Sequence, residues 1–216
     1  MIIYDNLGTY DVTLEVTNYY GTSSLTKSNY IVVTEGVVDG CTSSSLNNNA
    51  NYGCGVSYIS FNTLEHSTST FIPESSMQDF TCSKNTILNV GTIYDLVVIY
   101  KSRSDYSQFL EVWIDWDDNG TFEESNSNGV NERVLEDNIF PGSIATASAD
   151  VMTPSTAVLG KILRMRVISD LDQAPTVCGQ GFAQRADDYG IFVKELVQGC
   201  TDIEACNYNE NATDTD

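Results

Sequence analysis

Short runs of β-branched and aromatic residues recur along this 216-residue chain, separated by clusters of Gly, Asn, Asp and Ser. Such runs are typical of strands, and no stretch carries a sustained helical period with capping residues. Many short strands with frequent turn signals predict an all-β fold, an antiparallel β-sandwich of jelly-roll-like form. The expected strands span residues 10–17, 28–33, 56–61, 86–90, 94–101, 109–115, 133–136, 145–152, 162–169 and 189–197.

Two of these strands alternate cleanly between apolar and other residues. Leu110, Val112 and Ile114 share one face of the strand at 109–115, because successive side chains point to opposite faces. In residues 163–167 the two arginines likewise face away from the apolar set. We expect the apolar face of each strand to pack on the core.

The charge balance narrows the choice of partners. Ten basic residues against thirty acidic ones give a formal net charge of −20. A surface this negative repels phosphate backbones and anionic lipid heads, which disfavours nucleic acid and membrane-surface partners. It favours cations, and it also keeps an exported protein in solution. No apolar stretch is long enough to span a bilayer, so we expect no membrane insertion.

The cysteines indicate an oxidising compartment. They are well separated and form no CxxC pair, and the chain has one histidine, so a thiol-rich zinc site is disfavoured. An even count in an acidic chain predicts disulfides formed outside the cytosol, with fifteen complete pairings open. The disulfide candidates are Cys41, Cys54, Cys82, Cys178, Cys200 and Cys206.

The acidic segment 115–124 is the strongest candidate site. It places oxygen-bearing side chains at its first, third and fifth positions and Gly120 at its sixth, where the loop must turn sharply. This spacing is typical of a loop that wraps Ca²⁺, a cation that prefers oxygen ligands. The expected ligands are Asp115, Asp117 and Asn119 through side chains, Thr121 through its carbonyl, and Glu123 or Glu124 to close the site.

This segment has two other interpretations. An EF-hand is disfavoured, because Asn126 stands where that motif has its bidentate Glu and because the flanks resemble strands. An Asx-rich turn between two strands needs no metal and stays open. We favour calcium in a structural role.

The chain is expected to have three parts and to be a fragment. Residues 1–35 hold two strands, residues 38–197 hold the main domain, and residues 198–216 form a polar, acidic tail with two cysteines. The start of the chain has no secretory leader, although its composition suits an exported protein, which predicts a longer parent.

Residues 5–18, DNLGTYDVTLEVTN, together with Gly21 and the run YIVV at 30–33, resemble the C-terminal half of a PKD domain. The resemblance implies a truncated PKD-like hairpin, since the front half of that small sandwich has no counterpart here. Two strands cannot bury a core alone. We therefore expect the hairpin to be part of a larger domain of the parent.

Residues 41–195 resemble the GEVED domain, a β-sandwich of large secreted bacterial proteins. The namesake GEVEDY stands here as QRADDY at 184–189, without the glycine and the first glutamate. The residues that carry the resemblance are Cys41, QDFT at 78–81, VWIDWDDNGTF at 112–122, RMRV at 164–167, Cys178-Gly179 and DDY at 187–189.

This resemblance implies further roles. Asp187 or Asp188 would add oxygens to the metal loop; alternatively, Asp188 and Tyr189 are a structural pair, with the hydroxyl hydrogen-bonded at a sheet corner. It also implies a Cys41–Cys178 bridge. Cys54 would then pair with Cys82, and Cys200 with Cys206, unless Cys206 has a partner beyond Asp216.

The last part, with GCTD at 199–202 and ACNYN at 205–209, resembles short cysteine repeats near the ends of bacterial surface proteins. Together the resemblances imply a secreted or cell-surface location. Domains of these kinds accompany pappalysin-like zinc metalloproteases, so the parent is expected to be such an enzyme or a related surface protein.

Other chemistry is less well supported. His66 lies in a polar stretch with no HExxH motif and no nucleophile elbow, so we interpret it as a loop histidine. Trp113 and Trp116 flank the acidic loop and are either ligand contacts or packed side chains. A carboxylate pair for glycoside hydrolysis has little force in a chain with thirty acids.

The sequence therefore predicts a non-catalytic, calcium-stabilised accessory module of a larger exported bacterial protein. Its partners would be upstream domains of the parent. The alternative is a calcium-dependent adhesin module that binds an extracellular glycan or protein through the tryptophans, and a less favoured one is a carboxylate-based glycosidase.

Overall fold

A computed structural model of the chain describes residues 8–33, 40–46, 53–67, 77–197, 199–200 and 205. These residues form strands and turns, with no helix among them. The chain divides into two compact units, Met1–Gly36 and Val37–Asp216. The predicted all-β fold is confirmed.

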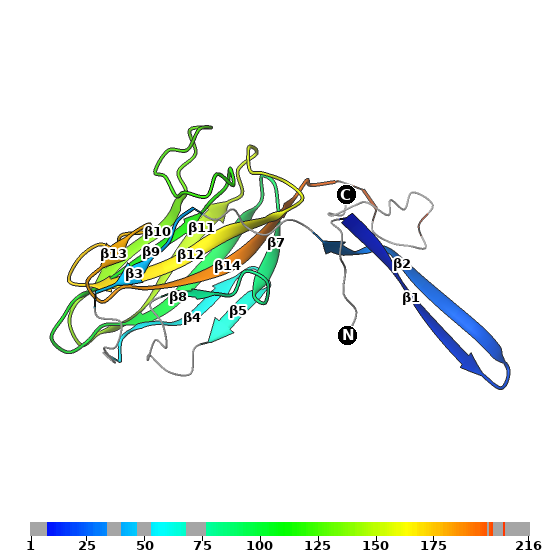
Figure 1. The fold of residues 1–216 in the computed structure, drawn as a ribbon, viewed down its shortest axis with the longest axis horizontal. Coiled ribbons are helices and arrows are strands. Elements are labelled where there is room, and N and C mark those ends of the chain that lie inside the picture. The colour runs from blue at the N-terminus through cyan, green and yellow to red at the C-terminus, as the bar shows by residue number, and fades with distance from the viewer. Residues whose placement is uncertain are drawn as a thin grey trace. The chain divides into compact units, whose positions relative to one another are not determined.

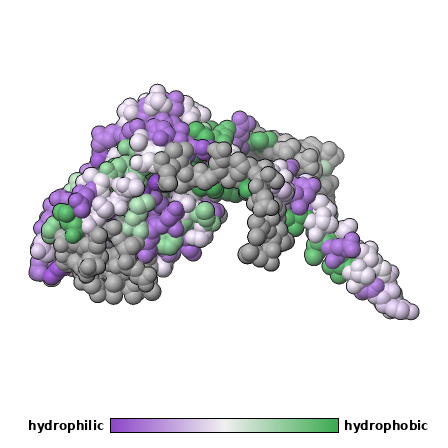
Figure 2. Space-filling model, in the orientation of Figure 1, coloured by the Kyte–Doolittle hydropathy of each residue, from purple (hydrophilic) through white to green (hydrophobic). Residues whose placement is uncertain are grey.

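The first unit contains an antiparallel hairpin of β1 (Gly8–Asn18) and β2 (Gly21–Val33). Leu14 lies opposite Leu25 in the register, so both side chains point to the same face. Each is more than 60% exposed, and hydrophobic residues lie on the hairpin surface in Figure 2. The described part of this unit therefore exposes apolar side chains that a complete domain would bury.

The second unit is a β-sandwich (Figure 1). One sheet has six strands in the order β10-β9-β12-β14-β6, with β7 also paired to β14, and the other has the order β11-β8-β4-β5. A two-residue parallel bridge joins β13 to β3. The strands are β3 (Ser44–Ser45), β4 (Gly55–Phe61), β5 (Leu64–Ser67), β6 (Met77–Asp79), β7 (Asn85–Asn89), β8 (Ile93–Lys101), β9 (Gln108–Ile114), β10 (Arg133–Ile139), β11 (Ile144–Met152), β12 (Ile162–Leu171), β13 (Gln180–Gly181) and β14 (Arg185–Lys194).

The main core follows from the alternation along the strands. Leu110, Val112 and Ile114 of β9 belong to one buried cluster with Ile59 and Phe61 of β4, in the other sheet. All five side chains are completely buried. This confirms the expected core face of β9.

The opposite face of the six-stranded sheet is also covered. A second buried cluster joins Trp113 and Ile168 on the sheet to Cys41 and Phe122, which come from segments distant in sequence. Strands β9, β12 and β14 are consequently buried on both faces. Arg164 and Arg166 do face away from the core, as expected, but they are buried beneath these segments.

The six-stranded sheet is mixed, whereas we expected antiparallel sheets. Strands β6 and β7 both run parallel to β14 and pair with successive parts of the same edge. The turn between them crosses Gly190, where an added Cβ would lie 2.5 Å from the carbonyl oxygen of Thr81. Only glycine leaves room for this crossing.

All ten expected strands are present, with ends shifted by up to seven residues, the largest shift being at the start of β2. The last one begins at Arg185 instead of residue 189, because the acidic residues before Tyr189 belong to the strand. The four strands that the sequence did not indicate are short: β3, β5, β6 and β13. His66, expected in a loop, lies on β5.

Candidate metal centre

Three carboxylates meet where two neighbouring strands are joined. Asp115 directly follows β9, Asp117 is two residues further, and Glu132 directly precedes β10. Ligand atoms of the three lie within 4.8 Å of one another. Because β9 and β10 are antiparallel partners, the two ends of the connecting loop must meet at this point.

Backbone N–H groups hold Asp115 and Glu132 in place. Asp115 accepts bonds from the N–H groups of Asn119 and Gly120, at 3.1 and 3.0 Å. Glu132 accepts the N–H of Trp116 on one oxygen and that of Glu123 on the other, both at 3.0 Å. The carboxylates therefore organise the loop as an Asx-rich turn would, whether or not an ion is bound.

The charges of this cluster are poorly compensated. Asp115 is 2% exposed and Glu132 is fully buried. Burial, followed by the negative charges of Glu132 and Asp117, raises the pKa of Asp115 to about 6. Burial and the charge of Asp117 also raise the pKa of Glu132. Three acids held this close would repel one another when all are ionised.

Asp117 supplies the observation that favours a cation. Its Oδ2 accepts a bond from the Ser127 hydroxyl at 3.0 Å. Its Oδ1 is buried and has no hydrogen-bond partner within the described part of the chain. A buried carboxylate oxygen without a donor is costly, and an oxygen-preferring cation such as Ca²⁺ would satisfy it. The residues present fit such an ion, with Asp115, Asp117 and Glu132 as the side chains that would hold it.

The other expected ligands of the loop are arranged differently. The side chain of Asn119 accepts bonds from Thr121 and donates to Glu123, and the Thr121 hydroxyl donates to Glu123 at 2.7 Å. Glu124 forms an ion pair with Arg133 at 2.8 Å. The structure thus brings the first and third positions of the predicted site together, while Glu123 and Glu124 do not belong to the carboxylate cluster.

Asp187 and Asp188 do not join the acidic loop. Strand β12 lies between β9 and β14, so arginines separate the two acidic stretches. Asp188 is paired with Arg166, at 2.7 Å to each oxygen, and Asp187 is paired with Arg185 at 3.1 Å. The expectation that either acid adds oxygens to the loop is therefore corrected.

Glu132 was missed at the level of sequence. It lies 17 residues after Asp115 in an unremarkable Asn-Glu-Arg stretch and matches no calcium-loop spacing. One signal was present: it directly precedes the strand expected at 133–136. If that strand pairs with the preceding one as a hairpin, the residue just before it lies opposite the residue just after its partner.

Tyr189 matches the structural alternative. It is 1% exposed, and its hydroxyl lies 3.0 Å from Nδ1 of His66 on the opposite sheet. Its ring stacks with that of Phe80. His66 is therefore a packed strand residue, and burial lowers its pKa, with a further lowering from the charges of Lys84 and Arg185.

The two tryptophans are packed side chains. Trp113 is 5% exposed and Trp116 is 1% exposed. The indole N–H of Trp113 donates to Glu111 at 2.8 Å, and Arg133 lies over its ring. The possible ligand contact at Trp113 and Trp116 is corrected, because neither ring reaches the surface.

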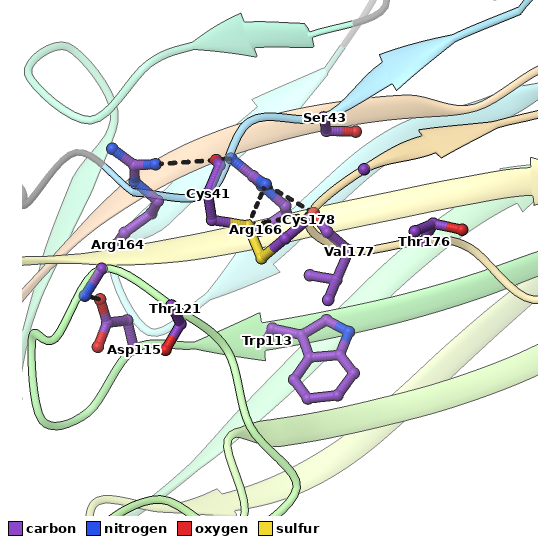
Figure 3. The surroundings of a disulfide bond; sticks show 12 residues. Cys41, Ser43, Trp113, Asp115, Thr121, Arg164, Arg166, Thr176, Val177 and Cys178 are labelled. Carbon is purple, nitrogen blue, oxygen red and sulfur yellow. Dashed lines mark hydrogen bonds between the residues drawn. A yellow bond between two sulfur atoms is a disulfide. The ribbon is translucent and has the colours of Figure 1, made fainter.

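The disulfide implied for Cys41 and Cys178 is present (Figure 3). The Cys54–Cys82 pair is corrected, since Cys54, Cys82 and Cys200 are free among the described cysteines. Cys54 is next to Gly55, which lies near Ser169 in β12. Cys82 is next to Thr81, which crosses Gly190, and Gly190 lies opposite Arg164 in β12. Ser169 and Arg164 are five residues apart along β12, which corresponds to about 17 Å. This separation is beyond the reach of a disulfide. Cys206 lies outside the described residues.

The fold and site define a disulfide-bridged β-sandwich with a carboxylate cluster in one inter-strand loop. Residues 109–192, which span this loop and the late Asp-Asp-Tyr, match the model of the GEVED domain. No curated protein matches the chain. No described segment forms a helix that is long and apolar enough to cross a membrane.

One solved structure with a detectable likeness comes from a study of glycolipid glycan hydrolysis by a family 123 glycoside hydrolase from Clostridium perfringens. It is 16% identical, with a TM-score of 0.34 over 59% of this chain. The alignment covers 24% of that enzyme, so this chain spans about a quarter of it. A likeness this weak carries no conclusion about activity.

Proposed function

We propose that this chain is a non-catalytic accessory module of a larger exported protein, and that Ca²⁺ bound by Asp115, Asp117 and Glu132 stabilises it. The buried, unpartnered Oδ1 of Asp117 beside two further buried carboxylates carries this proposal. Calcium would neutralise the cluster and fix the loop whose Phe122 packs with Trp113.

Several observations support the accessory role. The match to the GEVED domain suggests an accessory module. The disulfide between Cys41 and Cys178 and the net charge of −20 suit an extracellular location. The exposed apolar residues of the β1–β2 hairpin are what a PKD-like half-domain would present to the rest of its domain. A zinc metalloprotease remains the proposed class of parent.

The adhesin alternative loses its main argument, because both tryptophans proposed as contacts are buried. The described carboxylate cluster gives no support to the glycosidase alternative, because each of its carboxylates is bound by loop N–H groups or a hydroxyl. We therefore put forward one function.

Thermal unfolding with calcium and with a chelator tests the proposal. We expect calcium to raise the midpoint of the wild type and to leave Asp117→Asn unchanged. In chelator, Asp117→Asn should match or exceed the wild type, because it removes one of three mutually repelling charges. Glu195→Gln, which removes an exposed acid elsewhere, is the matched control and should keep the calcium shift. A midpoint that ignores calcium in the wild type would refute the calcium role.

A further inference from the structure

The two sulfurs of the Cys41–Cys178 disulfide lie in different surroundings. Cys41 is 1% exposed and belongs to the second buried cluster. Cys178 is exposed, on the segment between β12 and β14. Thiol–disulfide exchange requires an incoming thiolate to reach one sulfur while the other leaves. In the folded protein, Cys178 is the exposed residue of the pair, and attack at its sulfur makes Cys41 the leaving group.

The leaving sulfur is placed beside a fixed cation. Nη1 of Arg166 lies 3.0 Å from Sγ of Cys41, and Nη2 donates to the carbonyl oxygen of Cys41 at 3.0 Å (Figure 3). Arg166 is completely buried and is held in place by Asp188 and by the carbonyl of Val177. An arginine N–H directed at a cysteine sulfur stabilises the thiolate, and a better leaving thiolate speeds exchange.

The backbone around Cys41 remains attached after cleavage. Its carbonyl oxygen accepts bonds from Arg166 and, at 3.4 Å, from Arg164, and neither bond depends on the disulfide. Cleavage thus frees Cys178 and leaves the Cys41 sulfur poised to attack it again.

From this geometry we propose that Cys178 is a site of reversible covalent attachment for thiols, with Cys41 as the resolving cysteine. The thiolate of an external low-molecular-weight or protein thiol attacks Sγ of Cys178. A mixed disulfide forms, the Cys41–Cys178 bond breaks, and its electron pair remains on Cys41 as a thiolate beside Arg166. Return attack by Cys41 releases the thiol and restores the bridge.

Two features of the chain determine which kind of thiol attacks Cys178. Burial raises the pKa of the free Cys54 to about 11, so its thiolate is scarce at neutral pH and an internal attack by this residue is disfavoured. The net charge of −20 favours the approach of a cationic thiol over an anionic one. Cysteamine and glutathione are suitable probes of the two kinds.

Adduct mapping on the folded, disulfide-bonded protein tests the proposal. After exposure to excess cysteamine, acid quenching and alkylation, peptide mass spectrometry should find cysteamine on Cys178 and the alkyl group on Cys41. We expect the Cys178 adduct to exceed the Cys41 adduct by at least about tenfold when folded, and this preference to vanish in urea. Glutathione should react more slowly, and added salt should narrow the gap. Equal adducts in the folded protein, or adducts in urea only, would overturn the proposal.

Variants that keep one cysteine of the bridge, read out by peptide mapping, test the role of Arg166 without altering it. In Cys178→Ser the thiol of Cys41 remains, and in Cys41→Ser that of Cys178 remains. The alkylation of Cys41 should have its pH midpoint below that of Cys178, although Cys41 is the more buried. Near-ultraviolet circular dichroism verifies that both variants are folded. A Cys41 midpoint equal to or above that of Cys178 shows that Arg166 does not activate the leaving sulfur, which contradicts the proposal.

Discussion

Arg166 of β12 and Asp188 of β14 lie opposite each other in the register and form a two-point ion pair, with both N···O distances at 2.7 Å. Both side chains are almost completely buried. The same guanidinium bonds the carbonyl oxygens of Cys41 and Val177, so it ties two distant segments to the sheet. The Asp-Asp-Tyr stretch therefore contributes to the structure through Asp188, which pairs with Arg166 and not with the acidic loop.

Loss of the Asp188 charge should be strongly destabilising. Asp188→Asn leaves the buried Arg166 without a counter-charge, and we expect the free energy of unfolding to fall by about 3–5 kcal/mol. Asp105→Asn is the control, because Asp105 and its partner Arg103 are exposed, and its loss should stay below about 1 kcal/mol. Urea titration measures both. A similar small loss in the two variants would show that the buried pair contributes little.

The acidic loop should make stability depend on pH when calcium is absent. The pKa of Asp115 is about 6 in the folded chain against 3.8 for the free side chain. The folded state therefore binds this proton more tightly, and the contribution of Asp115 to stability in chelator should rise by about 2 kcal/mol as the pH falls from 7 to 4. Saturating calcium competes with the proton and should remove the rise.

Asp115→Asn isolates this contribution. We expect the difference in unfolding free energy between wild type and variant, measured in chelator, to change between pH 7 and pH 4. The change should equal the contribution expected for Asp115 alone. Identical pH profiles for the two proteins would contradict the assignment.

The strands were predictable from local alternation, because a period of two places Leu110, Val112 and Ile114 on one face whatever lies elsewhere. The segments that cover the opposite face of the sheet were not predictable from this alternation. Trp113 is buried by Cys41 and Phe122, and the position of Cys41 is set by contacts that span more than a hundred residues. A strand pattern indicates which residues share a face, but not which distant segment covers it.

The carboxylate cluster was predictable only in part, for the same reason. Asp115 and Asp117 follow from loop spacing, whereas Glu132 arrives through the pairing of β9 with β10. For Asp188 the prediction was wrong in the opposite sense, because it assigned to the site a residue that lies elsewhere. Two acidic stretches were expected to meet, yet β12 places Arg164 and Arg166 between them, and Asp187 and Asp188 each pair with an arginine.

His66 should oppose the acidic loop in its response to pH. Its pKa is lowered from 6.5 in the folded protein, first by burial and then by Lys84 and Arg185. The stability that it contributes is present above pH 6.5 and is lost as the pH falls below that value toward the folded pKa. His66→Gln, which keeps a polar group for Tyr189, should lose less stability on acidification than the wild type. Because His66 lies on β5 of one sheet and Asp115 follows β9 of the other, the two effects should add. Equal acid losses in both proteins would argue against this role.

Glu132 and Asp117 should respond differently to neutralisation, although both belong to the carboxylate cluster. Glu132 accepts bonds on both oxygens, from Trp116, Asn126 and Glu123. Glu132→Gln turns one acceptor into a donor that faces these donors, so we expect a loss of about 1–3 kcal/mol in chelator. Asp117→Asn meets no such conflict, because Oδ1 of Asp117 has no donor in the described structure. Chemical denaturation in chelator measures the contrast, and circular dichroism confirms that both variants fold. If Asp117→Asn were the more destabilising of the two in chelator, the loop would depend on Asp117 for more than its charge.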